Sequence, residues 1–587
     1  MKRISRVFSS SPKPVPVVSQ PETAAPEAPK HLLEDRSIDD NRPLRVLVIG
    51  AGISGILSCI RFRQRIQNLE ICVYDKNEDI GGGLGLKTDT LDALVVNIPA
   101  HTYQATFEPN KEWSTFYASA PEIHRYWKHV VDKYGCMDYI KLRQEVTSAT
   151  WDEKSSKWKL EIQDLETGST YSDEGNIVIQ GTGSLNNWKW PQIPGLHDFK
   201  GKLLHSARWD EEYDYSDQRV AVIGNGSSGI QIVPGILSKV THIDHYVRSR
   251  TWVSPTFARD HIEKHGKGDD NFHFSAEDIE RFKANHEEYQ KFRKGVELEL
   301  QSIHGATLNG HPMQVGAQEA FIENMKRRLA KKPELIDDLI PSFPPACRRL
   351  TPGPGYLEAL TDAKVEMIRS EIAKVDETGI ITADGQHRPI DAIVCATGFD
   401  TTCTPRFPIR GRNGLLLSER WKKTPETYIS VATDGFPNYF ISLGPNAALG
   451  EGNLLLLIEK EIDYFTECVQ KVQRDNIRAM APRKDAVRRF TQYCDEYFKG
   501  TVFGGKCRSW YKGGTEEGRI IALWPGSSLH AMKVFKQPRW EDFDYEYIND
   551  NPFGWIGDGW TDNEKNNRIN VDYLDDDQIQ FPALGET

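Results

Sequence analysis

The sequence predicts an α/β fold with two Rossmann-like dinucleotide-binding domains and a helical insertion in the second. Two short apolar runs, Leu44–Ile49 and Arg219–Ile223, are typical of buried parallel strands. Each ends at a G-x-G-x-x-G turn, Gly50-Ala-Gly52-Ile-Ser-Gly55 and Gly224-Asn-Gly226-Ser-Ser-Gly229. A strand, this turn and a helix together form the dinucleotide-binding pattern.

The insertion is predicted from the composition of residues 254–340. This stretch is charged and poor in β-branched residues, and its apolar positions follow a helical period over Ala276–Leu300 and Val315–Lys332. The sequence indicates helices here and nothing finer.

Overall composition excludes several classes of protein. The chain has 587 residues and a net charge of −11, without a long basic block, so nucleic acid is not an expected partner. Its longest apolar run, Leu454–Ile458, is far too short to span a membrane. The nine cysteines include no C-x-x-C pair, which favours a reduced, cytoplasmic chain with ordinary thiols. Lys2, Arg3 and Arg6 leave an organelle presequence open, but a plain flexible tail is favoured.

The first turn carries the marks of an adenosine site with free ribose hydroxyls. Gly50 permits the tight turn, Gly52 lets a phosphate approach the backbone, and Gly55 lets the following helix pack on the sheet. A second strand ends in Asp75, about twenty residues further on, where a carboxylate can bind the ribose. Because Asp75 would repel a 2′-phosphate, this domain is predicted to bind FAD. A generic strand-turn-helix is the alternative.

The second turn is followed by positive charge instead. Where an acidic residue would be expected after the next strand, the chain has Arg248, Ser249 and Arg250. A guanidinium beside a hydroxyl suits a 2′-phosphate, so Gly224, Gly226, Ser227 and Gly229 are predicted to bind NADPH. Solvated surface arginines remain the alternative.

The stretch between the two turns reads Phe199-Lys-Gly201-Lys-Leu-Leu-His205-Ser-Ala-Arg-Trp209-Asp210. It resembles the fingerprint F-x-G-x-x-x-H-x-x-x-W-[P/D] of the type I Baeyer–Villiger monooxygenases. The resemblance extends over about residues 43–545 and looks closest to members from the secondary metabolism of filamentous fungi. It implies that NADPH reduces FAD, that O2 then forms a C4a-peroxyflavin, and that a bound small-molecule ketone becomes an ester or lactone.

The same resemblance assigns roles to single residues. Arg349, the second of a basic pair, occupies the place of the active-site arginine, and Asn97 stands where the family has a carboxylate that orients it. His205 and Trp209 are implied to couple cofactor binding to domain movement. Further cofactor contacts are implied for the following residues: Gly82, Tyr103, Val146, Thr397, Gly398 and Trp510. For Trp510, an ordinary core tryptophan is an equal alternative.

One segment departs from the family pattern. The flavin-lining motif G-G-T-W-x-x-N-R-Y-P-G-x-x-C-D-x-P-A-H-T-Y is matched at its flanks, by Gly81–Gly83 and Asn97–Tyr103, but not between them. A coding sequence for Leu84–Val95, read from its third base, can yield W-F-E-N-R-Y-P-G-R-A-C, which restores the motif. We therefore hypothesise a reading-frame excursion between about Gly83 and Val96. A diverged loop is the alternative, and flavin binding or activity would then be impaired.

The expected domain order follows from these assignments. It comprises a disordered tail (1–42), a first FAD-binding segment (43–190), a first NADPH-binding segment (191–253), a helical subdomain (254–340), a second NADPH-binding segment (341–397), a second FAD-binding segment (398–545) and a C-terminal extension (546–587).

Three alternative functions remain open. Flavin N- or S-oxygenases share both turns, although their linker usually does not end in Trp-Asp. A flavin-dependent reductase would need a redox cysteine pair, and a non-catalytic nucleotide-binding protein requires a genuine 84–96 segment. Neither the ketone nor the oligomeric state can be read from the sequence.

Overall fold

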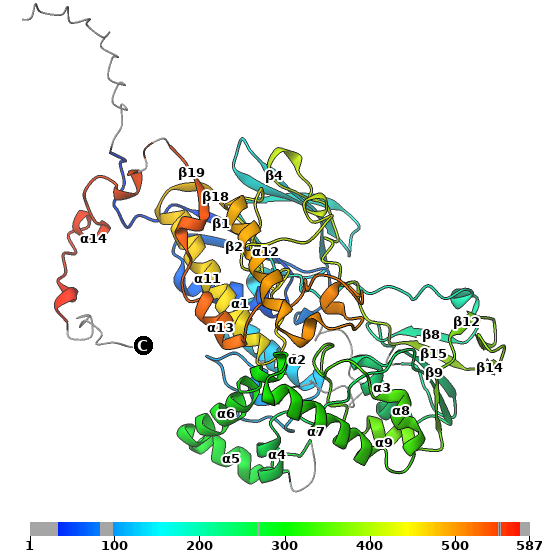
Figure 1. The fold of residues 1–587 in the computed structure, drawn as a ribbon. Helices are drawn as coiled ribbons and strands as arrows, with labels where there is room; N and C mark the ends of the chain where they lie inside the picture. The colour runs from blue at the N-terminus through cyan, green and yellow to red at the C-terminus, as the bar shows by residue number, and fades with distance from the viewer. Residues whose placement is uncertain are drawn as a thin grey trace, which may run out of the picture. The chain divides into compact units, whose positions relative to one another are not determined.

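The computed structural model describes residues 33–82, 98–210, 212–266, 271–549, 551 and 553–575 (Figure 1). Asn97 and the hypothesised frame excursion at 84–96 therefore lie outside the described residues. The chain divides into two compact units, Asn41–Ile548 and a smaller one that joins Met1–Asp40 to Asn549–Thr587. None of the described helices is long and apolar enough to cross a membrane.

The first sheet of the larger unit is parallel and contains the first glycine turn. Its strand order is β17-β7-β1-β2-β3, with β1 (Leu44–Ile49), β2 (Leu69–Tyr74), β3 (Ile140–Lys141), β7 (Ile177–Gln180) and β17 (Tyr439–Ile441). Alternate side chains of a strand point to opposite faces. Val46 and Val48 accordingly pack in the core beneath α1 (Ile53–Arg65), α2 (Ala120–Lys133) and α11 (Leu454–Arg474).

The other face of this sheet is covered by a second, four-stranded sheet. Leu47 and Ile49 pack there in a core with Trp158 and Leu160. The covering sheet has the order β16-β4-β5-β6, with β4 (Gln144–Asp152), β5 (Lys157–Asp164), β6 (Thr170–Gly175) and β16 (Ile409–Arg410). The strand carrying the first turn is thus buried on both faces, as its continuous apolar run predicts.

The second parallel sheet contains the second glycine turn. Its order is β11-β10-β9-β15-β8, with β8 (Lys202–His205), β9 (Arg219–Ile223), β10 (His242–Tyr246), β11 (Val365–Ile368) and β15 (Ala392–Cys395). Helices α3 (Ser227–Leu237) and α9 (Tyr356–Thr361) pack on it. A small antiparallel sheet follows, formed by β12 (Ile372–Val375), β13 (Gly379–Thr382) and β14 (His387–Pro389). The prediction of a mixed α/β chain with two parallel, Rossmann-type sheets is confirmed.

The insertion is helical, drawn in green in Figure 1. It consists of α4 (Arg259–His265), α5 (Ala276–Ala284), α6 (His286–Gln301), α7 (Pro312–Arg328) and α8 (Ile336–Leu339). The stretch Ala276–Leu300, predicted to be helical, is divided into two helices at Asn285, which is extended and whose side chain accepts the N–H of Glu288. Asparagine at this position competes with the helix backbone and starts a new helix.

The C-terminal part returns to the first sheet after residue 398. Besides β17 and α11 it forms β18 (Ile477–Pro482), α12 (Lys484–Lys499), α13 (Ser528–Val534) and β19 (Phe543–Tyr547). Helices α1 and α11 lie side by side. Trp188 and Phe399 form an isolated antiparallel β-bridge. This bridge places the two segments that connect the parallel sheets next to each other.

The smaller unit is held by backbone hydrogen bonds between its two pieces. The N–H of Ile38 donates to the carbonyl of Trp560 at 3.0 Å, and that of Asp558 to the carbonyl of Arg36 at 3.0 Å. Residues 33–40, which composition placed in the tail, therefore pair with the C-terminal extension. A short helix, α14 (Asp562–Lys565), begins there with a capping box between Thr561 and Glu564.

Candidate cofactor and active site

The first turn has a geometry that only glycine tolerates. Gly50 has φ +108°, and a Cβ on it would lie 2.6 Å from the carbonyl oxygen of Gly181. A Cβ on Gly55 would lie 1.9 Å from the oxygen of Gly50. At Gly52, by contrast, the nearest atom to a Cβ would be Cα of Gly82, at 3.8 Å. Gly52 therefore keeps the approach to the start of α1 open, while its neighbours close the turn against the sheet.

Asp75 lies at the end of β2 and is bonded to the turn itself. Its Oδ2 accepts the N–H of Ala51 at 2.6 Å, and its Oδ1 accepts that of Asn77 at 2.8 Å. Burial raises the pKa of this carboxyl, while the hydrogen bonds from Asn77 and Ala51 oppose the rise. Asp75 thus fixes the turn, a role that the sequence pattern did not reveal, and each oxygen retains a lone pair for another donor.

Three further predicted contacts have different surroundings. Gly82, with φ +60°, faces Gly52 across the turn. Tyr103 is half-buried directly after a short 3₁₀ turn over Ala100–Thr102. Val146 is buried in the core between the two sheets, so only its backbone is left to contact a ligand.

The second turn repeats the geometry of the first. Gly224 has φ +110°, with a Cβ position 2.5 Å from the oxygen of Ala396, and a Cβ on Gly229 would lie 1.9 Å from the oxygen of Gly224. Around a Cβ on Gly226 there is open space within 4 Å. Ser227, the first residue of α3, places its Oγ 2.6 Å from Oγ1 of Thr351.

Positive charge gathers beside this turn, around Ser249. The side chain of Asn225 donates to the Ser249 carbonyl at 2.7 Å, which ties the loop after β10 to the turn. Nη1 of Arg348 donates to Ser249 Oγ at 3.1 Å and to the Arg250 carbonyl at 3.2 Å. The Arg348 guanidinium lies over the ring of Phe343, 4.9 Å from the centroid.

The charges of this group oppose one another. Burial lowers the pKa of Arg348 most, and the positive charges of Arg248 and Arg508 lower it further. The negative charge of Glu516 raises it, but by the smallest amount. Arg348, bonded to Ser249 and in the field of two further guanidinium groups, gives this side of the open glycine turn a positive potential that suits an anion. Arg348 and Arg508 were not singled out in the sequence; the available signal for Arg348 was its adjacency to Arg349.

Arg349 points away from this group, toward the C-terminal part. Its Nη1 donates to the carbonyl of Leu449 at 3.3 Å. Its charge also acts on Tyr511: burial raises the pKa of this tyrosine to about 12, and the charge of Arg349 opposes the rise. Within the described ranges no carboxylate pairs with Arg349. The half-buried Trp510 has its ring centroid 4.7 Å from that of Tyr511, so Arg349 and Trp510 are both neighbours of this tyrosine.

His205 lies at the junction between the parallel sheets. It is buried at the end of β8 and stacks on Trp188, with centroids 4.7 Å apart. Nδ1 accepts the N–H of Ala207 at 3.1 Å, which leaves the proton of the neutral ring on Nε2, 3.3 Å from Oγ1 of Thr397. Burial lowers the pKa of His205 and so favours this neutral form.

The other junction residues complete this arrangement. Gly398 follows Thr397 with φ +81° and open space at its Cβ position. Trp209 is buried in the core of the second sheet, where it stacks on Tyr215 at 5.4 Å. His205 and Trp209 therefore connect the junction to the second sheet. Of the other predicted residues, Asp75 and Gly82 lie at the first turn, Ser249 is tied to the second, and Arg349 lies beside Tyr511.

Comparisons with known proteins agree with this architecture. A family model described as flavin-binding monooxygenase-like matches residues 43–262. The FAD-binding monooxygenase tazF of Aspergillus terreus is 38% identical over 522 residues, covering 88% of this chain and 92% of that protein. A Baeyer–Villiger monooxygenase of Streptomyces coelicolor is 31% identical over 491 residues, covering 83% and 89%.

Solved structures show the same fold. Cyclohexanone monooxygenase from Rhodococcus sp. Phi1 bound to NADP⁺ has a TM-score of 0.73 at 25% identity, covering 86% of this chain and 100% of that one. An oxidised steroid monooxygenase bound to NADP has a TM-score of 0.72 at 25% identity, covering 86% and 99%. With this fold and relatives more than 30% identical along most of its length, the chain belongs to the flavin-binding monooxygenase family, among its Baeyer–Villiger members.

Proposed function

We propose that the protein is an NADPH- and O2-dependent flavoprotein monooxygenase that converts a small-molecule ketone into an ester or lactone. The observation that carries the proposal is a pair of glycine turns with the same backbone geometry and opposite neighbouring charge. Asp75 adjoins the first turn, whereas at the second turn Arg348 donates to Ser249, which directly follows Arg248 in the chain.

The residues at the first turn fit FAD. The open side of Gly52 and the N–H groups at the start of α1 suit the pyrophosphate, and the remaining lone pairs of Asp75 suit ribose hydroxyls. Bound FAD would supply the electron transfer from NADPH and the reaction with O2. Gly82 and the backbone of Val146 are proposed to line its site.

The residues at the second turn fit NADPH. Gly226 leaves open space for the pyrophosphate, and the arginines around Ser249 would neutralise the 2′-phosphate. Thr397 holds Nε2 of His205 beside the connection to the first domain. We infer that His205 and Trp209 transmit cofactor binding between the two domains.

Arg349 is the proposed catalytic residue. A guanidinium stays charged throughout the accessible pH range, and Arg349 is half-buried, where its field is less screened by water than at the surface. Its charge would stabilise the negative oxygen that develops when oxygen adds to the ketone carbonyl. Trp510, next to Tyr511, is proposed to contact the nicotinamide half of NADPH.

The proposed substrate class follows from the relatives. FAD-binding monooxygenases of Aspergillus terreus and Emericella nidulans are among the relatives, which supports a fungal secondary-metabolite ketone. A cytoplasmic location stays a prediction.

The test is oxidation of matched substrates by the purified chain. We expect a yellow flavin spectrum, NADPH oxidation stimulated by a ketone, and an ester or lactone that carries one oxygen atom from ¹⁸O2. Tertiary amines and thioethers of similar size serve as matched alternatives. Oxidation of these without ester formation would assign the chain to the N- or S-oxygenases instead.

A second experiment tests the reading-frame hypothesis for segment 84–96. The chain as printed is compared with one in which Leu84–Val95 is replaced by W-F-E-N-R-Y-P-G-R-A-C. A large gain in bound flavin on replacement supports the frame hypothesis, whereas full flavin content in both chains supports a diverged loop. Sequencing the transcript decides the origin directly, because a codon set that does not yield the motif in the shifted frame contradicts the hypothesis.

A further inference from the structure

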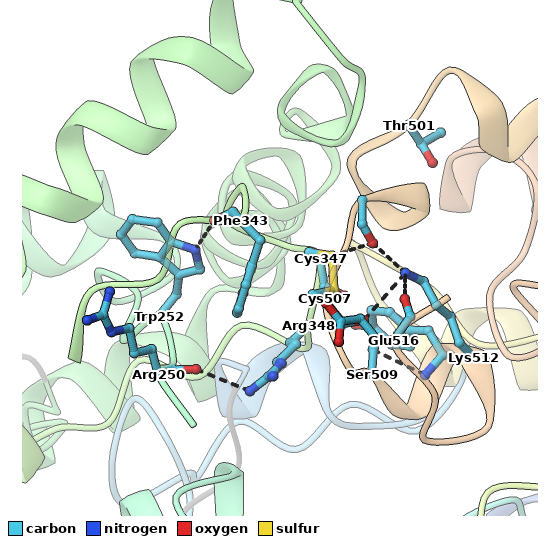
Figure 2. Close-up of a disulfide and its surroundings, with 12 residues drawn as sticks. Arg250, Trp252, Phe343, Cys347, Arg348, Thr501, Cys507, Ser509, Lys512 and Glu516 are labelled. Atoms are coloured by element: carbon cyan, nitrogen blue, oxygen red, sulfur yellow. Dashed lines mark hydrogen bonds between the residues drawn. A yellow bond between two sulfur atoms is a disulfide. The ribbon is translucent and has the colours of Figure 1, made fainter. Parts of the chain in front are cut away.

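A disulfide joins the two segments that carry the basic residues of the second site. Cys347 and Cys507 are 160 residues apart in the sequence and their Cα atoms are 6.4 Å apart (Figure 2). This corrects the expectation that all nine cysteines are ordinary thiols. Cys347 immediately precedes Arg348 and Arg349, and Cys507 immediately precedes Arg508.

The bond holds together groups that repel each other. Arg508 and Arg348 act on one another as like charges, since the charge of Arg508 lowers the pKa of Arg348. Without a bound anion, nothing in their charges favours this approach. A covalent link between the residues that precede them fixes the segment from which Arg348 reaches Ser249, and so preorganises this arginine for an anion.

The Cys507 segment has a second anchor on its own side. Lys512 is only 4% exposed, and its Nζ donates to the backbone carbonyls of Gly505, Cys507 and Glu516. These bonds shape the loop internally, as Figure 2 shows. The disulfide, in contrast, ties the shaped loop to the Arg348 segment.

The surroundings also suit the reduced cysteines. Sγ of Cys347 lies 3.6 Å from the carbonyl oxygen of Gly505, and Sγ of Cys507 lies 3.1 Å from that of Cys347. Two thiols would therefore find acceptors already in place. The sulfurs are buried, but Lys506 and Arg508 on either side of Cys507 are exposed, so a small opening of this loop gives a reagent access.

We propose that the Cys347–Cys507 disulfide is a reversible positioning bond that sets the affinity of the second site for the 2′-phosphate of NADPH. In the disulfide form the Cys507 loop holds the segment from which Arg348 reaches Ser249; in the dithiol form this tether is lost, and Arg348 is free to move away from the phosphate position. On oxidation the two thiols give two electrons and two protons to hydrogen peroxide, which becomes two water molecules, and an S–S bond forms. A small dithiol reverses the step by exchange, becoming a disulfide itself. The inference rests on the proposed function in that the second site binds NADPH.

The experiment measures binding rather than turnover. Calorimetry on the full chain gives the Kd of adenosine 2′,5′-bisphosphate and of 5′-AMP, after peroxide or dithiol treatment, with the state of Cys347 and Cys507 read by peptide mass mapping. We expect reduction to weaken the bisphosphate about tenfold, the effect of losing one charge-assisted contact, and to leave 5′-AMP unchanged. A purely structural bond would weaken both ligands alike.

Variants separate the bond from general damage. A Cys347→Ser/Cys507→Ser double variant should bind the bisphosphate as the reduced protein does under both treatments. The matched control, Cys403→Ser, changes a free, half-buried cysteine and should keep the full redox response. If the double variant does not fold, reduction of the unaltered chain still decides.

Three outcomes overturn the inference. They are equal bisphosphate affinity in both mapped redox states, equal weakening of both ligands, and cysteines that remain thiols after peroxide. If the bisphosphate binds in neither state, whereas 5′-AMP does, the NADPH assignment itself fails.

Discussion

Glu461 on α11 provides a direct test of the electrostatics beneath the first turn. It is fully buried, and Ser442 Oγ and the Leu443 N–H donate to its Oε2 at 2.9 and 3.0 Å. Oγ of Ser54, a residue of the first turn, lies 2.9 Å from Ser442 Oγ. Oε1 of Glu461 has no partner among the described residues. A chain of two hydroxyls thus connects the FAD turn to a buried carboxyl.

Burial raises the pKa of Glu461 from 4.5 to about 8, against the two hydrogen bonds. Such a shift corresponds to a differential free energy on the order of 5 kcal/mol. The folded state holds this proton more tightly than the unfolded state. The resulting contribution to the free energy of unfolding is therefore intact below about pH 4.5 and is lost as pH rises toward about 8. Above that pH both states are ionised, and the penalty is constant.

Glu461→Gln should therefore stabilise the protein at pH 8 by several kcal/mol relative to the parent chain, and should have little effect at pH 5. The glutamine oxygen can still accept from Ser442 and Leu443, while its NH2 replaces the unpartnered O–H. The assay is urea unfolding of the flavin-loaded protein at pH 5, 6, 7 and 8. Glu419→Gln, at an exposed position, is the control and should leave the pH slope unchanged. Parallel pH slopes for Glu461→Gln and the parent chain would refute the reasoning.

Three further predictions concern the two turns and the catalytic arginine. Arg349→Lys should lower kcat by about two to three orders of magnitude without abolishing flavin reduction by NADPH, because a lysine keeps the charge but not the planar donor geometry; stopped-flow reduction separates the two steps, and a parallel loss of reduction would contradict the assignment. Arg248→Ala should raise the Kd for NADPH by about 10- to 100-fold and leave NADH unaffected, a difference that calorimetry resolves; an equal loss for both would mean that Arg248 does not bind the 2′-phosphate. Gly229→Ala should unfold the second domain at a lower temperature than Gly226→Ala, since a Cβ at Gly229 would lie 1.9 Å from the Gly224 oxygen while Gly226 has open space; similar melting of the two variants would argue against the described turn.

The elements that sequence predicts well are those whose information is local. Each strand that carries a glycine turn is a continuous apolar run, and the turn itself requires glycine at fixed spacing. The boundary missed at Asn285 was also local in origin, because an asparagine followed by Glu287 and Glu288 is a typical helix start. The helical period of the apolar residues continues across Asn285, so periodicity alone does not reveal this helix start.

The features that sequence reasoning missed depend on contacts between distant segments. The bond from Asp75 to Ala51 exists because β1 and β2 pair in parallel and end at the same edge of the sheet. The approach of Arg508 to Arg348 and the Cys347–Cys507 bond require two segments 160 residues apart. Neither spacing nor composition encodes such pairings.

The two glycine turns share a backbone geometry, so the choice of cofactor at each turn falls to the side chains beside it. At the first turn a buried carboxylate bonded to the backbone cannot move away from a 2′-phosphate, and its repulsion acts against NADPH there. At the second turn the arginines around Ser249 repel one another until an anion joins them, so a ligand without a 2′-phosphate leaves that repulsion unrelieved. Specificity at the first turn therefore includes a penalty against the wrong cofactor, whereas at the second turn only a ligand with the 2′-phosphate gains from relieving the repulsion. A bond that fixes the Arg348 segment, such as Cys347–Cys507, strengthens the attraction for the 2′-phosphate at the second turn and leaves the binding of a ligand without it unchanged.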